Sequence, residues 1–215
     1  MRKFDVLESV AAPFPYANVD TDRIIRIERC ARVTRQDLGN WVFETERLNS
    51  DGSPNMDFVL HRPAFRGARI LVAEDNFGCG SSREMAVWAL TGIGIRCVIA
   101  PSFGEIFYNN CFQNGVLPIR LPAETVADLL RKLAEQEAAG DAPAPWTVDL
   151  SACRIATPWH PAIEFPIEPL RREALLEGLD SVGMTLKHSA AIEAFQARQR
   201  ETMPWVWLDR SAAAG

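Results

Sequence analysis

The sequence lacks the features of several large protein classes. No apolar run approaches the roughly 18 residues that a membrane-spanning helix needs, so we expect no membrane segment. Lysine and arginine form no cluster and the formal net charge is -5, which argues against a nucleic-acid partner. The first residues carry a basic pair, Arg2 and Lys3, but no apolar signal core, so we expect a cytoplasmic protein.

Residues that bind metals are few and scattered. The five cysteines are odd in number and contain no Cys-x-x-Cys pair, and they are Cys30, Cys79, Cys97, Cys111 and Cys153. This spacing predicts reduced thiols and favours neither a disulfide framework nor a zinc or iron–sulfur site. The three histidines share no metal-ligand spacing, and they are His61, His160 and His188. We therefore expect no metal and no cofactor on this chain itself.

Length and composition are those of a chain that can bury a core. With 215 residues and 47% hydrophobic content, we expect a single domain over residues 1–215. A second full catalytic domain does not fit into this length. The last segment, 201–215, is expected to lie on a neighbour or to be disordered.

Apolar strands and helical stretches alternate in the centre of the sequence. Short apolar runs predict strands at 70–73, 97–100 and 116–121, with helices that begin at Arg83 and at Ser102. Such alternation with short connections predicts an α/β fold in which helices flank a parallel central sheet.

The outer parts of the chain have weaker patterns. The remaining predicted elements are strands at 4–10 and within 148–167, and helices after Pro122, at 169–177 and at 189–200. Residues 27–55 are mixed in character and rich in arginine and glutamate, so we expect a mobile excursion there.

The most informative stretch is Asn-Phe-Gly-Cys-Gly-Ser-Ser-Arg-Glu-Met at 76–85, between a predicted strand and a predicted helix. Its two glycines let the backbone approach a ligand closely, and Ser81 and Ser82 fall where a helix start favours negative charge. Arg83 adds a planar fork of donors that suits a carboxylate or phosphate. A hydroxyl held among such positive groups loses its proton more readily. The turn therefore predicts an anion site in which Ser81 or Ser82 acts as a base.

A plainer interpretation of the same stretch remains open. Gly78 and Gly80 then only permit a tight turn, one serine caps the helix and Arg83 is solvated. Cys79 is either a reactive thiol or a small residue that a tight loop tolerates. Nucleotide binding is disfavoured in both cases, because the third glycine of a dinucleotide fingerprint and the Gly-Lys-Ser/Thr of a P-loop are missing.

A second polar cluster, Asn-Val-Asp-Thr-Asp-Arg at 18–23, follows a proline-rich segment at 12–15. Taken alone, Asn18, Asp20 and Thr21 are ordinary turn and helix-capping residues. Together with the glycine-rich turn, however, the cluster resembles the small subunits of 3-isopropylmalate dehydratase, the leucine-biosynthesis members of the aconitase family. The resemblance covers nearly the whole chain, and its further stretches lie at 57–60, 98–103, 106–108, 117–118 and 178–186.

The resemblance implies a fold, a partner and a reaction. The fold is the swivelling β/β/α domain of aconitase-type enzymes, here as a free-standing polypeptide. In that family three cysteines of a separate large subunit hold a [4Fe–4S] cluster. The chain is thereby expected to be the small subunit of a heteromeric hydro-lyase that is active only with its large subunit. The expected reaction converts 2-isopropylmalate, a small dicarboxylate, into 3-isopropylmalate through 2-isopropylmaleate.

The resemblance also implies roles for individual residues. Ser81 matches the serine base, which acts as an alkoxide, and Asp22 matches an aspartate that orients groups or relays protons from the other loop. Ser82 and Arg83 match residues that bind a substrate carboxylate. The residues expected to shape the two loops are Gly78, Gly80, Asn18 and Asp20.

One position departs from the family pattern. The family has histidine after Ser-Arg-Glu, whereas this chain has Met85, which takes no useful part in proton transfer. Two alternatives therefore stay open: a small subunit of a paralogous dehydratase for another alkylmalate such as citramalate, and a non-catalytic anion-binding regulatory module. The substrate-recognition loop of the family falls near 27–38, with Arg26 and Arg35 in or beside it and neither one assigned.

Overall fold

The computed structural model describes residues 1–140 and 142–207, and its internal contacts divide the chain into two compact units. The first unit is Met1–Leu179 and the second is Asp180–Gly215. The expectation of a single domain over 1–215 stays a prediction.

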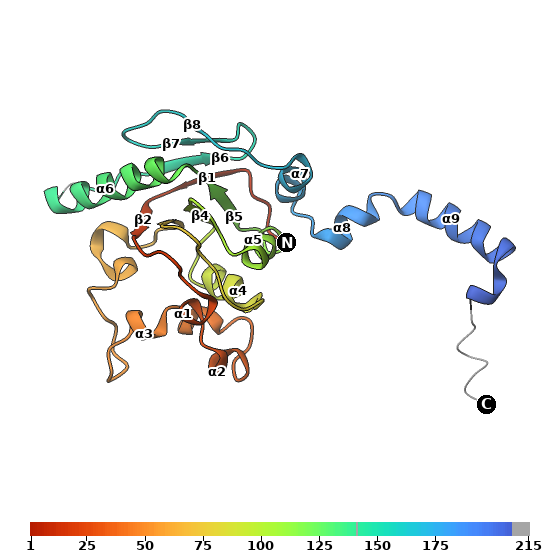
Figure 1. The fold of residues 1–215 in the computed structure, drawn as a ribbon, viewed down its shortest axis with the longest axis horizontal. Coiled ribbons are helices and arrows are strands. Elements are labelled where there is room, and N and C mark those ends of the chain that lie inside the picture. Colours follow the sequence, from red (N-terminus) through yellow and green to blue (C-terminus); the bar gives the residue numbers. More distant parts are fainter. Residues whose placement is uncertain (141, 208–215) are drawn as a thin grey trace. The chain divides into compact units, whose positions relative to one another are not determined.

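A parallel sheet forms the centre of the first unit (Figure 1). Its strands in spatial order are β2 (Ala11–Phe14), β3 (Ile70–Ala73), β4 (Cys97–Ala100) and β5 (Leu117–Arg120). Every residue of β2, β3 and β4 is buried, as expected for a parallel sheet covered on both faces. The predicted α/β fold with a parallel central sheet flanked by helices is confirmed.

The first strand of this sheet does not stand out in the sequence. We predicted one strand over 4–10, but the chain forms β1 (Val6–Ser9) and then β2, which belong to different sheets. β2 contains Pro13, which has no N–H group to contribute to a sheet. The proline is tolerated because β2 lies at the edge of the parallel sheet and pairs only with β3.

Helices cover the parallel sheet. The connections between consecutive parallel strands contain α4 (Met85–Gly92) and α5 (Glu105–Gln113), which contact each other. Right-handed crossovers, the rule for such connections, place both helices on one face of the sheet. The predicted helices started at Arg83 and Ser102, and the observed ones start two and three residues later because loops occupy those positions. The long helix α6 (Ala123–Ala139) packs on β2, β3 and β4. Its buried stripe is Val126, Leu129, Leu130 and Leu133.

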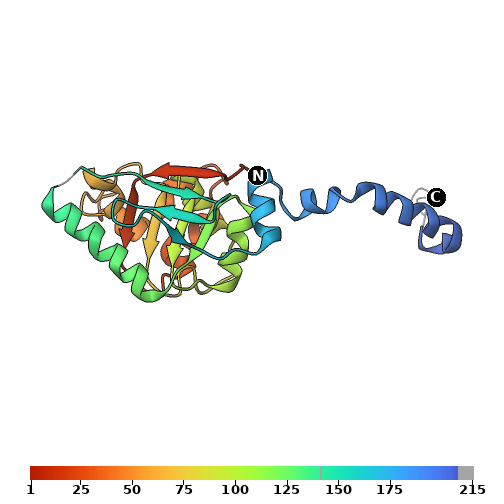
Figure 2. The ribbon, with the colours of Figure 1, turned by 90° about the horizontal axis from the view of Figure 1, so that it is seen from above.

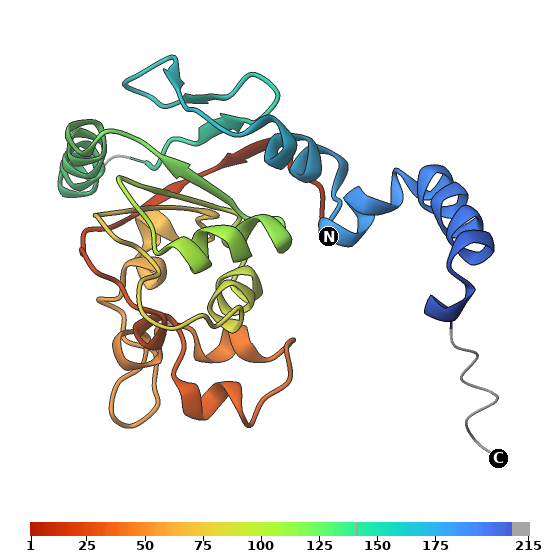
Figure 3. The same ribbon diagram turned by 45° about the vertical axis from the view of Figure 1, so that its right-hand side comes forward.

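A second sheet, which is antiparallel, covers the other side of the first unit (Figures 2 and 3). Its strands in order are β1, β6 (Trp146–Asp149), β7 (Arg154–Ala156) and β8 (Ile163–Glu164). Helix α7 (Pro169–Glu177) follows and ends the unit. The two sheets and the helices give a layered β/β/α arrangement.

Short helical turns build the segment between β2 and β3. They are α1 (Thr21–Ile24), α2 (Ile27–Cys30), η1 (Leu38–Trp41), α3 (Glu44–Arg47), η2 (Val59–His61) and η3 (Pro63–Phe65). We expected 27–55 to be a mobile excursion, yet Leu38, Val42 and Phe43 are fully buried in the core. Gly39 and Gly92 explain the close approach of η1 to α4, because a Cβ atom on Gly39 would lie 2.7 Å from the backbone of Gly92.

The second unit consists of α8 (Ser181–Leu186), α9 (Ser189–Thr202) and η4 (Pro204–Val206). Asp180 caps α8 by accepting a 2.8 Å hydrogen bond from the Gly183 amide. None of the residues in these helices is buried. The expectation for 201–215 falls in part on 208–215, outside the described residues. Among the described helices of the whole chain, none has the length and apolar character needed to cross a membrane, and the cytoplasmic location stays a prediction.

Candidate functional site

Three loops meet at the carboxyl-terminal ends of β2, β3 and β4, which is where parallel sheets usually bind ligands. Asn76, after β3, joins all three. Its backbone N–H donates to Ser102 Oγ at 2.9 Å, and its side-chain amide donates to Asn18 Oδ1 at 2.9 Å. Asn18 and Asn76 both adopt left-handed backbone angles, with φ of 55° and 58°. The two polar stretches found in the sequence therefore lie side by side.

Gly78 allows the closest approach between these loops. It has a φ of +74°, and a Cβ atom at this position would lie 2.2 Å from the ring of Phe107. Its N–H donates to the Val19 carbonyl at 2.7 Å. Gly80 differs, because a Cβ there would meet Asp20 at an ordinary 3.5 Å and only its φ of +92° favours glycine. Gly78 is thus required for packing and Gly80 for backbone conformation.

The first loop is aligned with the glycine-rich turn by backbone pairing. Thr21 donates its N–H to the carbonyl of Cys79 at 2.9 Å, and Asp20 forms a parallel bridge with Cys79. The Asp20 carboxylate accepts from the Arg23 amide at 2.6 Å and so caps α1. Asp20 is therefore used within its own loop.

Arg23 ties its own helix, α1, to the neighbouring helix α3. Its Nε donates to Glu46 Oε1 at 2.5 Å, and its guanidinium lies 4.0 Å from the ring centroid of Tyr16. The pKa of Arg23 is raised, chiefly by the hydrogen bond to Glu46. With Ile24 and Ile25 fully buried, α1 is a fixed support for the residues on its exposed side.

Ser81 contacts a residue that sequence reasoning had treated only as a cap. Its Oγ lies 2.9 Å from Thr21 Oγ1, and its N–H donates to the same Thr21 oxygen at 3.2 Å. Thr21 is 1% exposed, whereas Ser81 is exposed to solvent. The signal for Thr21 was its place between Asp20 and Asp22, but nothing in the sequence indicates a partner 60 residues away.

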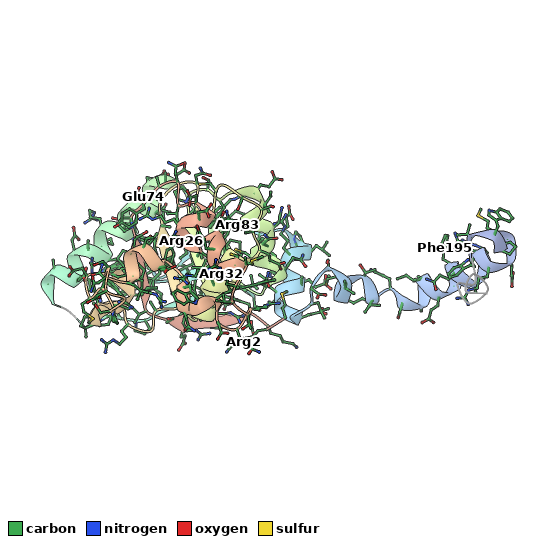
Figure 4. The ribbon with its side chains drawn as sticks, turned by 90° about the horizontal axis from the view of Figure 1, so that it is seen from below. Arg2, Arg26, Arg32, Glu74, Arg83 and Phe195 are labelled. Atoms are coloured by element: carbon green, nitrogen blue, oxygen red, sulfur yellow. The ribbon has the colours of Figure 1, made fainter. Side chains whose placement is uncertain are left out.

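Arg83 binds Asp22 through a two-pronged ion pair. Nη1 and Nη2 donate to the two carboxylate oxygens at 2.6 and 2.7 Å, and Nη1 also donates to the Ile25 carbonyl at 3.3 Å. The hydrogen bond from Arg83 lowers the pKa of Asp22, and the same bond raises the pKa of Arg83. Figure 4 shows Arg83 on the same side of the first unit as Arg26 and Arg32. The Arg83 side chain is only 16% exposed and its guanidinium is paired with Asp22, so the interpretation of Arg83 as a solvated residue is wrong.

Ser82 lies just before α4, and Met85 is its first residue. Ser82 is exposed, and Glu84 occupies the N-cap position without a side-chain hydrogen bond to the helix. Neither serine therefore caps α4, which removes that part of the plainer interpretation. Met85 is the first residue of the helix and packs against the core.

Two cysteines lie near this site: Cys79 in the turn, and Cys30, whose pKa is raised by burial and lowered in part by the nearby charge of Arg83. Cys79 is partly buried in the turn, and burial raises the pKa of its thiol, which disfavours the reactive thiolate. His61 contacts the Asn55 carbonyl, whereas His160 contacts Asp128. Among residues 1–140 and 142–207, no group of three histidine, cysteine, aspartate or glutamate side chains is placed to hold a metal ion. The side chains of this part of the chain therefore do not fit an iron–sulfur cluster.

The candidate site is an open surface. A cavity of about 640 Å³ lies beside β2 and α6, lined by Tyr16, Phe58, Leu130 and the Arg62–Glu137 ion pair among others. None of the predicted site residues lines it. Ser81 and Ser82 are instead exposed at the surface of this chain.

The sequence matches two protein families. Residues 1–124 match the aconitase C-terminal domain family. This matched range contains both polar loops and the strands β2 to β5. Residues 182–206 match the family formed by the C-terminal domain of the 3-isopropylmalate dehydratase small subunit. Fold and site thus define a domain of the aconitase C-terminal class.

Individual relatives narrow this class. The chain is 52% identical over 207 residues to a 3-isopropylmalate dehydratase small subunit of Rhodospirillum centenum, covering 95% of this chain and 98% of that one. It is 51% identical over 205 residues to the same subunit of Gluconacetobacter diazotrophicus, and the match covers 95% of this chain and 97% of that one. A crystal structure of 3-isopropylmalate dehydratase (leuD) from Methanocaldococcus jannaschii superposes with a TM-score of 0.60 at 25% identity. The superposition covers 89% of this chain and 99% of that one. The chain belongs to the family of 3-isopropylmalate dehydratase small subunits.

Proposed function

We propose that this chain is the small subunit of a heteromeric hydro-lyase that isomerises 2-isopropylmalate to 3-isopropylmalate through 2-isopropylmaleate in leucine biosynthesis. Relatives named for this enzyme match almost the whole chain at about half identity. The observation that carries the proposal is a pair of contacts between the two polar loops. Ser81 is hydrogen-bonded to Thr21, and Arg83 forms an ion pair with Asp22.

The reaction needs a strong base beside positive charge. The proton to be removed lies next to a carboxylate and is only weakly acidic. In the proposed step the C–H bond breaks and its proton passes to the Ser81 alkoxide. The electron pair of that bond forms the carbon–carbon double bond, and the hydroxyl group on the neighbouring carbon leaves as hydroxide. Rehydration reverses these events with the two carbons exchanged.

Arg83 is suited to bind a substrate carboxylate while it remains paired with Asp22. The ion pair uses the edge of the guanidinium formed by Nη1 and Nη2. The second edge, formed by Nε and the outer hydrogen of Nη2, can donate two parallel bonds to another carboxylate. Among the described residues, none accepts a hydrogen bond from Nε. Asp22 thereby orients the fork, and Ser82 supplies a hydroxyl donor from the same exposed turn.

The partner must supply what this chain does not hold. We infer a large subunit with a [4Fe–4S] cluster, because the donor set needed for a cluster is not gathered among the described residues here. When bound, such a cluster supplies a Lewis acid for the substrate hydroxyl. The exposed position of Ser81 and Ser82 supports a site that is closed by the partner.

Met85 bears on the two alternatives. Its side chain packs against the core at the start of α4, and the Ser81–Thr21 and Arg83–Asp22 contacts stand beside it intact. This arrangement supports a catalytic chain over a non-catalytic anion-binding module. It does not select among alkylmalates, so citramalate belongs in the assay.

The test is anaerobic co-expression with the large subunit, followed by an assay of 2-isopropylmalate and citramalate. We expect turnover of 2-isopropylmalate by the complex, and neither turnover nor stoichiometric iron in the small subunit purified alone. Preferred turnover of citramalate would assign the chain to the paralogous enzyme. A complex that contains iron but acts on no alkylmalate would support the non-catalytic module.

A further inference from the structure

Thr21 carries a buried hydroxyl, and within the described part of the chain its side-chain hydrogen bonds are all with Ser81. It is 1% exposed, and the other buried polar residue of the described chain, Arg96, is 8% exposed. A hydroxyl buried in this way needs hydrogen-bond partners. The contacts of Thr21 Oγ1 are the Ser81 N–H at 3.2 Å, Ser81 Oγ at 2.9 Å and the Ser81 carbonyl at 3.5 Å.

These three contacts favour one direction of the hydroxyl–hydroxyl bond. A backbone N–H can only donate, so the Ser81 amide occupies a lone pair of Thr21 Oγ1. If Ser81 Oγ also donated to Thr21, the Thr21 proton would be left with the carbonyl at 3.5 Å, the limit of a hydrogen bond. The better arrangement has Thr21 donating to Ser81 Oγ at 2.9 Å. The Ser81 proton is then not used in this bond, and Ser81 itself is exposed.

Thr21 is also held firmly in place. Its N–H is bonded to the Cys79 carbonyl at 2.9 Å, its neighbour Asp20 caps α1, and a β-branched side chain has few rotamers. A donor fixed before the reaction needs no reorganisation when charge develops on its acceptor. Hydrogen bonding to the charged form of a group favours that form.

We propose that Thr21 is a positioning residue for the reaction, which donates a hydrogen bond to Ser81 Oγ and stabilises its alkoxide. The inference rests on the proposed function, in which Ser81 takes the substrate proton. It adds that the aspartate-rich loop supplies the group that prepares the serine, in addition to the partner of Arg83.

The test compares Thr21→Val, which keeps the shape but loses the hydroxyl, with Thr21→Ser, which keeps the hydroxyl. Each is assembled with the large subunit and assayed for turnover, for its pH profile, and for solvent exchange of the substrate proton next to the carboxylate. Thr125→Val, the same change on α6, is the control, and the folding of each variant is checked by thermal melting.

For Thr21→Val we expect exchange and kcat to fall roughly 10- to 150-fold, as for loss of a hydrogen bond to a charged group. We expect KM to stay within about twofold, because the contact is made to the base and not to substrate. The rising limb of the pH profile should move to higher pH, and Thr21→Ser should restore most of the rate.

An unchanged rate and pH profile in Thr21→Val would overturn the inference. Equal loss in Thr21→Val and Thr21→Ser would also overturn it, because it would indicate a packing role. A raised KM with normal kcat would do the same, by placing Thr21 on the substrate. These outcomes differ from failure of the proposed function, in which the unaltered complex itself would neither exchange the proton nor turn over isopropylmalate.

Discussion

Arg83 holds both carboxylate oxygens of Asp22, at 2.6 and 2.7 Å, across 61 positions of sequence. This ion pair joins α1, which follows β2, to the loop after β3, and it occupies the Nη1–Nη2 edge of the guanidinium. The proposed function gives Arg83 a second role beside this structural link, as the residue that binds a substrate carboxylate.

The ion pair predicts the titration of Asp22. Because the hydrogen bond from Arg83 lowers its pKa, Asp22 should titrate below its ordinary value of 3.8. The native state thus keeps Asp22 ionised where the unfolded chain protonates it. Its stabilising contribution should be present above about pH 4 and be lost as pH falls through the lowered folded-state pKa. The stabilisation of the folded state by this ion pair is modest, because the Asp22 side chain is 56% exposed to solvent.

Carboxyl-carbon NMR over the acid range measures this pKa directly. In Arg83→Met the Asp22 titration should return towards 3.8. A midpoint that does not move in this variant would mean that another group perturbs Asp22.

Replacement of Arg83 by lysine should impair the assembled enzyme. Lysine keeps the charge but has one nitrogen, so it cannot bind Asp22 and a substrate carboxylate through two separate edges. We expect kcat/KM to fall roughly 10- to 150-fold, the effect of losing a hydrogen bond to a charged group. Arg131→Lys is a matched control, because Arg131 also pairs with two carboxylates but lies on α6. Unchanged steady-state kinetics in Arg83→Lys would place Arg83 outside the site.

Two glycines offer a comparison of packing with backbone strain. Gly78 and Gly52 both have positive φ, +74° and +82°, but a Cβ on Gly78 would meet the Phe107 ring at 2.2 Å while nothing lies within 4 Å of one on Gly52. Gly52→Ala should cost about 1 to 2 kcal/mol of unfolding free energy from its left-handed backbone. Gly78→Ala should cost a further 1 to 3 kcal/mol or so, from overpacking. Urea denaturation measures both, and equal losses would contradict the close packing described for Gly78.

The strands of the parallel sheet were predictable where the chain is apolar on both faces. Strands β3 and β4 have the predicted bounds, 70–73 and 97–100. Strands that are buried on both faces of a sheet consist of continuous apolar residues, which are visible in the sequence. β2 was missed because Pro13 interrupts the pattern, and only the finished sheet shows that this strand lies at an edge. The change of sheet between β1 and β2 likewise depends on pairing with distant strands.

The sequence singled out the residues of the candidate site, whose roles stay predictions, but it did not predict the contacts between them. The glycine-rich turn and the Asn18–Asp22 cluster were both recognised from residue types, and their proximity came from the family resemblance. Thr21 was missed as a partner of Ser81 because a threonine beside aspartates is a common helix cap. Its burial at 1% exposure follows from tertiary packing and has no local signature.

The role of Ser81 as the base is best tested by solvent exchange of the substrate proton next to the carboxylate, in complexes assembled with Ser81→Ala or Ser82→Ala. Loss of the base should reduce exchange by roughly 10² to 10⁴ in Ser81→Ala. Ser82→Ala should retain exchange and show a raised KM, because it loses one hydrogen bond to a bound carboxylate. Loss of exchange in Ser82→Ala with retention in Ser81→Ala would transfer the base to Ser82, and full exchange in both would contradict the serine mechanism.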